Sequence, residues 1–268
     1  MHASQRTGAD QAELSSFRVL LGVQVLATAV FGLVPLLLPT VFADITGYTG
    51  DDTIVYRLAG AATTGYLVAA IVALASRTPW VDLRIPMVAT FTFTSIAALA
   101  SLGTLLAGDR HWIVVVVLLA ATVFAVLAAY WLRRDEGPAA PAGRALPTEF
   151  KVVVGLATLS AGVFGLMPLL AAGPFASLFG LLGTDTWMFR MAGAACFGYA
   201  TSGVLSLRAE GYERFAVQNM AAIAFNALAA VSAWKAVIGG DGGWLAPVVG
   251  LAATFFAISL SWLAIRMR

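Results

Sequence analysis

Two arginines lie near the start of apolar segments, where their charge could hold an anion. Arg57 is the second residue of YRLAGAATTGY, and Arg190 has the same place in FRMAGAACFGY. Each follows an Asp-Thr pair by a few residues, and Asp52 and Asp185 are typical of helix N-caps. Two guanidinium groups beside two helix N-termini suit a carboxylate or phosphate group. The pattern therefore predicts an anion-binding site.

Other readings of the arginines stay open. A cation in the first turns of a helix opposes the macrodipole, and burial costs more unless the side chain reaches the interface. Each arginine could therefore reach its own cap aspartate or lipid phosphates, or contact a partner subunit. In the anion-site hypothesis, Tyr66 and Tyr199 lie about 2.5 turns deeper and line a cavity below the arginines.

The residues for other chemistry are missing. All acidic residues fall in loops or at segment ends, which disfavours a proton relay or cation coupling. His2 and His111 lie outside the apolar segments, and Cys196 is the only cysteine, so neither a metal site nor a disulfide is expected. The motifs HExxH and GxSxG and Gly-rich phosphate loops do not occur. We therefore expect no enzymatic activity, no cofactor and no metal.

The composition indicates a multi-pass membrane protein. Of the 268 residues, 60% are hydrophobic and only 11% are charged, whereas soluble domains have about a quarter charged residues. The net charge of +2 and the absence of a long basic run argue against nucleic acid as a partner. The expected partners are the lipid bilayer, a membrane protein or a second copy of the chain, and a small anionic ligand.

Eight apolar stretches are long enough to cross a bilayer, for which about 20 residues are needed. They are 19–39, 54–76, 85–107, 112–132, 151–172, 187–207, 215–238 and 244–265. The first stretch could pass for a signal peptide, but its copy at 151–172 lies in mid-chain, so we interpret both as retained spans.

The basic residues predict the orientation. Twelve lysines and arginines flank one side of the predicted membrane and four flank the other. Because basic residues concentrate in the cytoplasm, both termini are expected there, in the bacterial inner membrane.

The two halves of the chain are similar in sequence. Residues 17–67 align with 150–200 without a gap, and 24 of the 51 pairs are identical. After a one-residue deletion, Phe93 aligns with Phe225 and Trp112 with Trp244. This predicts an all-α fold of two parallel four-helix repeats, 1–132 and 150–268, joined by a cytoplasmic linker, 133–149. With four spans each, the repeats would be related by a pseudo-two-fold axis along the membrane normal.

Small residues in the repeated phrase indicate close helix packing. Helices in lipid associate where glycine and alanine allow close approach, especially in small-xxx-small patterns. Gly65 and Gly198 belong to such patterns, and Gly60 and Gly193 add a second smooth position on the same helices. We expect these glycines to serve packing, with the helices of 54–76 and 187–207 at the centre.

The spacing of the glycine, proline and arginine residues, GLxPLL…P…F…G…R…GA…GY, resembles that of DoxX-like small bacterial membrane proteins, here duplicated. This resemblance implies an accessory membrane subunit. The first functional hypothesis is therefore a non-enzymatic accessory or scaffold subunit that acts by association. The alternative is an uncoupled permease or binding protein for a small anion or amphiphile, with its site between the repeats.

Overall fold

The computed structural model describes residues 8–76, 78, 80–134 and 146–267, and the side chains from residue 16 onward. This part of the chain forms helices and no strand. The elements are α1 (Gly8–Thr28), the π-helical turn η1 (Ala29–Leu33), α2 (Val34–Leu37), α3 (Pro39–Thr46), α4 (Thr53–Ala75), α5 (Trp80–Leu106), α6 (Trp112–Leu132), α7 (Thr148–Leu170), α8 (Ala172–Phe179), α9 (Thr186–Leu207), α10 (Glu213–Gly239) and α11 (Leu245–Met267).

Seven segments of the described chain are long and apolar enough to cross a membrane, which indicates a multi-pass membrane protein. They are Ser16–Leu37, Thr53–Ala75, Trp80–Leu106, Trp112–Leu132, Thr148–Leu170, Glu213–Gly239 and Leu245–Met267. The eighth predicted span, 187–207, corresponds to α9, which is not among the seven. Most of α9 is buried against other helices, so its residues need not be as apolar as those that face lipid.

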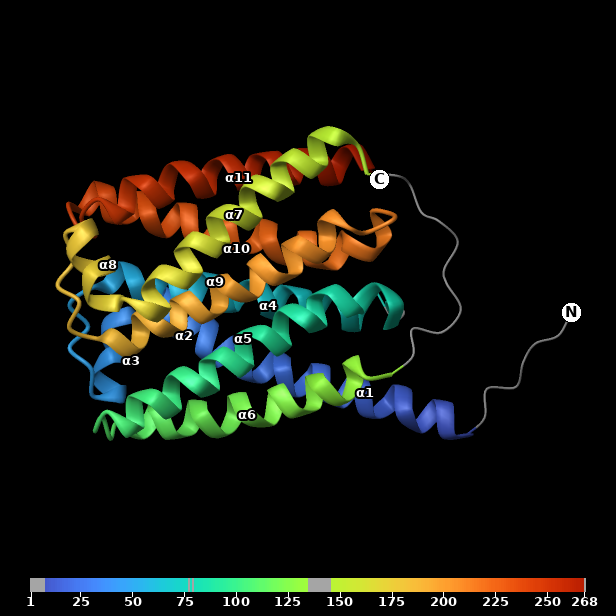
Figure 1. The fold of residues 1–268 in the computed structure, drawn as a ribbon, viewed down its shortest axis with the longest axis horizontal. Coiled ribbons are helices and arrows are strands. Elements are labelled where there is room, and N and C mark those ends of the chain that lie inside the picture. Colours follow the sequence, from blue (N-terminus) through green and yellow to red (C-terminus); the bar gives the residue numbers. More distant parts are fainter. Residues whose placement is uncertain (1–7, 77, 79, 135–145, 268) are drawn as a thin grey trace, which may run out of the picture.

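The long helices lie side by side, and the start of α1 and the end of α11 lie at the opposite end of the bundle from the short helices α3 and α8 (Figure 1). The start of α1, the end of α6, the start of α7 and the end of α11 share one end. The short helices α3 and α8 lie at the other end, before α4 and α9. Most of the predicted linker, 133–149, falls outside the described residues.

The two halves, residues 16–134 and 146–267, are packed into each other. Helix α4 packs along α10, and α9 packs along α5. By contrast, α4 has few contacts with α5, and α9 has few with α10, although each of these pairs is consecutive in the chain. Helices α4 and α9 also touch each other. The core therefore depends on contacts between the halves.

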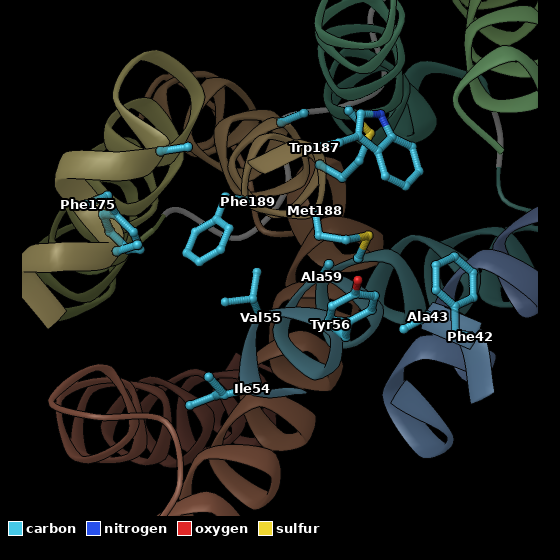
Figure 2. Packing of buried hydrophobic residues seen from close by; sticks show 14 of the residues in the cluster. Phe42, Ala43, Ile54, Val55, Tyr56, Ala59, Phe175, Trp187, Met188 and Phe189 are labelled. Atoms are coloured by element: carbon cyan, nitrogen blue, oxygen red, sulfur yellow. The ribbon is translucent and has the colours of Figure 1, made fainter. Parts of the chain in front are cut away.

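A large hydrophobic cluster near the end that carries α3 and α8 joins the halves (Figure 2). The first turns of α4 and α9 supply its centre, with Val55 and Tyr56 on one side and Met188 and Phe189 on the other. Phe42 of α3 and Phe175 of α8 flank this centre. The cluster fixes the starts of α4 and α9, which carry the two arginines.

Candidate functional site

The two arginines differ in the contacts that they make. Both are half-buried, in the second turns of α4 and α9. Arg190 donates a hydrogen bond from Nη1 to Oγ1 of Thr104 on α5, at 3.0 Å. Arg57 makes no hydrogen bond or ion pair with any residue that the structure describes. Neither guanidinium group makes a hydrogen bond or ion pair with Asp52 or Asp185 within the described residues, so the local pairing with the cap aspartate is not formed there.

The aspartates differ from their predicted role. Asp52 and Asp185 occupy the N-cap positions of α4 and α9, but neither side chain bonds to its own helix. Asp52 instead accepts hydrogen bonds from the backbone N–H groups of Leu182 and Gly183, at 3.0 and 2.7 Å. The loop before α9 turns at Gly183, where φ is +72°, and it presents both N–H groups to a carboxylate of the other half.

Asp185 makes the reciprocal contact with the first half. It accepts from the backbone N–H groups of Thr49 and Gly50 and from the hydroxyl groups of Thr49 and Tyr56, at 2.7–3.1 Å. Gly50 also has a φ of +72°. Both aspartates are buried, at 6% and 3% exposure, so backbone and hydroxyl donors must stabilise their charge. We call the two aspartates with residues 49–50 and 182–183 the aspartate clasp.

The two tyrosines form a second reciprocal contact, in the middle of α4 and α9. The hydroxyl of Tyr66 donates to the carbonyl of Ala195 at 2.9 Å, and that of Tyr199 donates to the carbonyl of Ala62 at 3.0 Å. The ring centroids are 4.8 Å apart. The pair therefore ties the central helices together rather than lining one cavity below the arginines.

The predicted packing glycines lie at close helix contacts. A Cβ atom at Gly65 would collide with the hydroxyl of Tyr199, and one at Gly198 would collide with the hydroxyl of Tyr66. A Cβ atom at Gly60 or Gly193 would come within 2.6 Å of a carbonyl oxygen, that of Gly32 or Gly165. Gly65 and Gly198 therefore serve contacts between the halves, and Gly60 and Gly193 serve contacts within each half.

Each half also has a partly open apolar cavity that the sequence did not predict. The first cavity, of about 110 Å³, lies among α1, α4, α5 and α6. The second, of about 140 Å³, lies among α7, α9, α10 and α11. An engineered 150 Å³ apolar cavity in another protein stays dry and binds benzene, so these volumes suit an apolar group.

The two cavities are built from aligned residues. Tyr66 and Phe93 line the first cavity, and Tyr199 and Phe225 line the second. Further aligned pairs are Phe31 and Phe164, Pro35 and Pro168, Phe42 and Phe175, Ala121 and Ala253, and Phe124 and Phe256. The same space thus occurs once in each half.

Each cavity also takes part of its wall from the other half. Val55 and Leu58 of α4 line the second cavity, and Trp187, Met188 and Met191 of α9 line the first. No charged residue lines either cavity, and both arginines lie outside their walls. The cavities therefore suit uncharged or apolar groups rather than an anion.

A polar cluster connects two loops in the first half only. The hydroxyl of Tyr48 donates to Asp109 at 2.9 Å, and the backbone N–H of His111 donates to the same carboxylate at 3.0 Å. Burial and the hydrogen bond to Asp109 raise the pKa of Tyr48 well above its usual value. Partial burial acts to raise the pKa of Asp109, but the hydrogen bonds from His111 and Tyr48 outweigh it, and that pKa is lowered. The cluster holds the loop after α3 against the loop between α5 and α6.

Within the described residues, no group of three or more His, Cys, Asp or Glu side chains is placed to hold a metal ion. The candidate site is therefore the pair of apolar cavities. Comparison with models of protein families, with curated proteins and with solved structures finds no match to this chain.

Proposed function

We propose that this chain is a non-enzymatic membrane protein that binds an apolar or amphiphilic molecule, with one site in each half. The two cavities carry the proposal. Their walls are formed by residues that align between the two halves and include no charged side chain. Each wall also includes residues of the other half. Of the functions predicted from the sequence, the binding of an amphiphile agrees best with this arrangement.

The small anion is the less favoured ligand. An anion in an apolar site needs a cationic or hydrogen-bonding partner, because its desolvation is costly. Arg57 and Arg190 line neither cavity, and Arg190 is bonded to Thr104. The proposal therefore assigns the arginines to the bundle and the membrane interface, outside the binding sites.

We further propose eight spans in two parallel repeats, with α9 as the additional span. The reciprocal bonds of the clasp and of Tyr66 and Tyr199 support a pseudo-two-fold relation between the halves. The start of α1 and the end of α11 lie at the same end of the bundle (Figure 1), as an even number of spans requires. With the distribution of basic residues, this supports cytoplasmic termini in a bacterial inner membrane. External labelling of a cysteine introduced at the exposed Leu182, but not of one at Ala140, is the expected result in intact cells.

Cys196 offers a direct test of binding, because it is the only cysteine and lines the second cavity. The purified protein in lipid nanodiscs would be treated with methylmercury chloride, and the rate of Cys196 modification followed by intact mass. We expect dodecane to slow the reaction by occupying the cavity. Ala253→Phe, which fills the second cavity, should slow the reaction without dodecane and remove the dodecane effect.

Ala121→Phe is the matched control, because Ala121 is the aligned residue in the first cavity. This variant should leave the Cys196 rate and its response to dodecane unchanged. The proposal would be contradicted if Ala253→Phe slowed the reaction while dodecane had no effect on the wild type. The accessory-subunit hypothesis would then be favoured.

A further inference from the structure

Gln218 places an unusual polar group on the wall of the second cavity. It lies on α10, one and a half turns from the helix start, and is 3% exposed. A carboxamide has two donor hydrogens and an acceptor oxygen, and a buried one needs partners for both ends. Which end of this side chain is paired decides what the cavity can recognise.

The hydrogen bonds around Ser202 show the orientation of the carboxamide. The hydroxyl of Ser202 donates its one proton to the carbonyl of Tyr199, at 3.0 Å. It must therefore act as the acceptor in its contact with Gln218, which donates from Nε2 at 2.8 Å. The nitrogen end of the carboxamide is therefore paired. Its oxygen, Oε1, accepts no hydrogen bond from any residue in the described part of the chain.

The carboxamide of Gln218 belongs to the wall of the second cavity. Its Oε1 keeps some accessible surface. An unpaired acceptor in an apolar space favours a ligand that brings a hydrogen-bond donor. No charged side chain lines this cavity, so an ammonium or carboxylate group would be desolvated without an ionic partner. An uncharged donor, such as a hydroxyl group, meets both conditions.

The shape of the cavity indicates what the rest of the ligand looks like. On α10 the wall extends from Phe215 to Ala229, which corresponds to roughly 21 Å of helix. On α7 it extends over a similar length, from Val154 to Pro168. Gln218 lies near one end of this length, and the walls beyond it are mainly aromatic and aliphatic. The space is therefore long, narrow for its length, mainly apolar and partly open, and the buried carboxamide of Gln218 lies near one end of it.

We infer that the second cavity binds a long-chain alcohol, with the chain along α10 and the hydroxyl donating to Oε1 of Gln218. This inference rests on the proposed function, and it adds the chemical class of the ligand. At the position aligned with Gln218, the first half has Pro86, so a carboxamide at this place on the wall occurs only in the second half. The carboxamide of the first cavity, Gln24, comes from a different helix and contacts Oγ1 of Thr90.

The Cys196 assay tests the inference when alcohol and hydrocarbon are compared. We expect dodecan-1-ol to protect Cys196 at a concentration about 3–10-fold lower than dodecane does, as a single net hydrogen bond allows. Farnesol has a branched isoprenoid chain, so comparing it with dodecan-1-ol distinguishes an isoprenoid alcohol from a fatty alcohol as the ligand. A preference for either alcohol over dodecane supports the inference. Gln218→Met should abolish the preference for alcohol and keep the protection by dodecane, which also shows that the cavity is still formed.

Asn226→Leu tests the other carboxamide on this wall: its Nδ2 donates to the carbonyl of Ala222, its Oδ1 also accepts no hydrogen bond from a described residue, and Asn226 is less buried than Gln218. This variant should keep the preference for alcohol. Equal protection by alcohol and dodecane in the wild type, or a preference that persists in Gln218→Met, would overturn the inference and leave the proposed function standing. Absence of protection by all these probes would overturn both.

Discussion

At the scale of single residues, glycine determines how closely the halves approach. The repeated small-xxx-small pattern predicts that Gly65 and Gly198 face a neighbouring helix, and they do lie at contacts between the halves. The pattern does not identify the neighbour, because helical periodicity shows which face is smooth but not what packs on it. The structure supplies this neighbour, a tyrosine hydroxyl that crosses from the other half.

Adding one methyl group at these glycines should therefore loosen the bundle. Gly65→Ala and Gly198→Ala force the tyrosine away from the carbonyl oxygen to which it donates, and overpacking of this kind costs about 1–3 kcal/mol. The midpoint of thermal unfolding in detergent should fall for both variants. In Gly65→Ala, the further change Tyr199→Phe should cost less than it does alone, because the two residues are coupled.

Gly22→Ala and Gly155→Ala are the controls, since no atom lies within 4 Å of a Cβ built at either position. Alanine favours helix over glycine by about 1 kcal/mol, so these variants should be neutral or more stable. If Gly65→Ala had the same midpoint of thermal unfolding as Gly22→Ala, α4 would not approach Tyr199 as closely as the structure shows.

At the scale of elements, the loops before α4 and α9 are held by the opposite half. The sequence places Asp52 and Asp185 correctly at the starts of two helices, but it suggests a local cap because it contains only local distances. The carboxylates instead accept hydrogen bonds from the other half of the molecule. The two donors to Asp52 lie 130 and 131 residues away from it in the sequence. The glycines that turn each loop, Gly50 and Gly183, each provide one of the backbone donors.

The clasp predicts an unequal effect of two equivalent substitutions. Asp185→Asn affects four hydrogen bonds, including the one from Tyr56, whereas Asp52→Asn affects two. In each case the NH₂ group of the asparagine replaces one acceptor oxygen, so at least one donor is left without a partner. A buried donor left unpaired costs about 1–3 kcal/mol. The thermal midpoint should therefore fall further for Asp185→Asn than for Asp52→Asn.

Asp51→Asn is the control for the clasp, because Asp51 is exposed and accepts a hydrogen bond from the hydroxyl of Thr184. It should change the midpoint little. Equal midpoints for all three variants would show that the clasp does not stabilise the protein.

At the scale of the whole molecule, the helical membrane class follows from composition alone, and the boundaries of most long helices follow from the apolar stretches. The packing does not, because aligned repeats can form two separate bundles or one shared bundle with the same sequence pattern. The structure has the shared form, in which α4 packs along α10 and α9 along α5. The cavities cannot be predicted from the sequence for the same reason, because residues from both halves form their walls.

The shared packing predicts that neither half is stable alone. Expression of residues 1–134 or 146–268 separately should give aggregated or degraded protein, because α4 or α9 would lose the helix along which it packs. Coexpression of the two fragments should restore a complex that can be purified with a tag on either fragment. A separately expressed half that is monodisperse and thermally stable would show that the predicted repeats, 1–132 and 150–268, are independent domains.

The most direct test of the central claim is a density map of the protein purified from its native membrane into nanodiscs. We expect elongated density inside the second cavity, beside Phe225 and reaching toward Gln218, and corresponding density beside Phe93 in the first cavity. Ala253→Phe should remove the density from the second cavity only. A map in which side chains close both cavities, with lipid density confined to the outer faces of the bundle, would contradict the account.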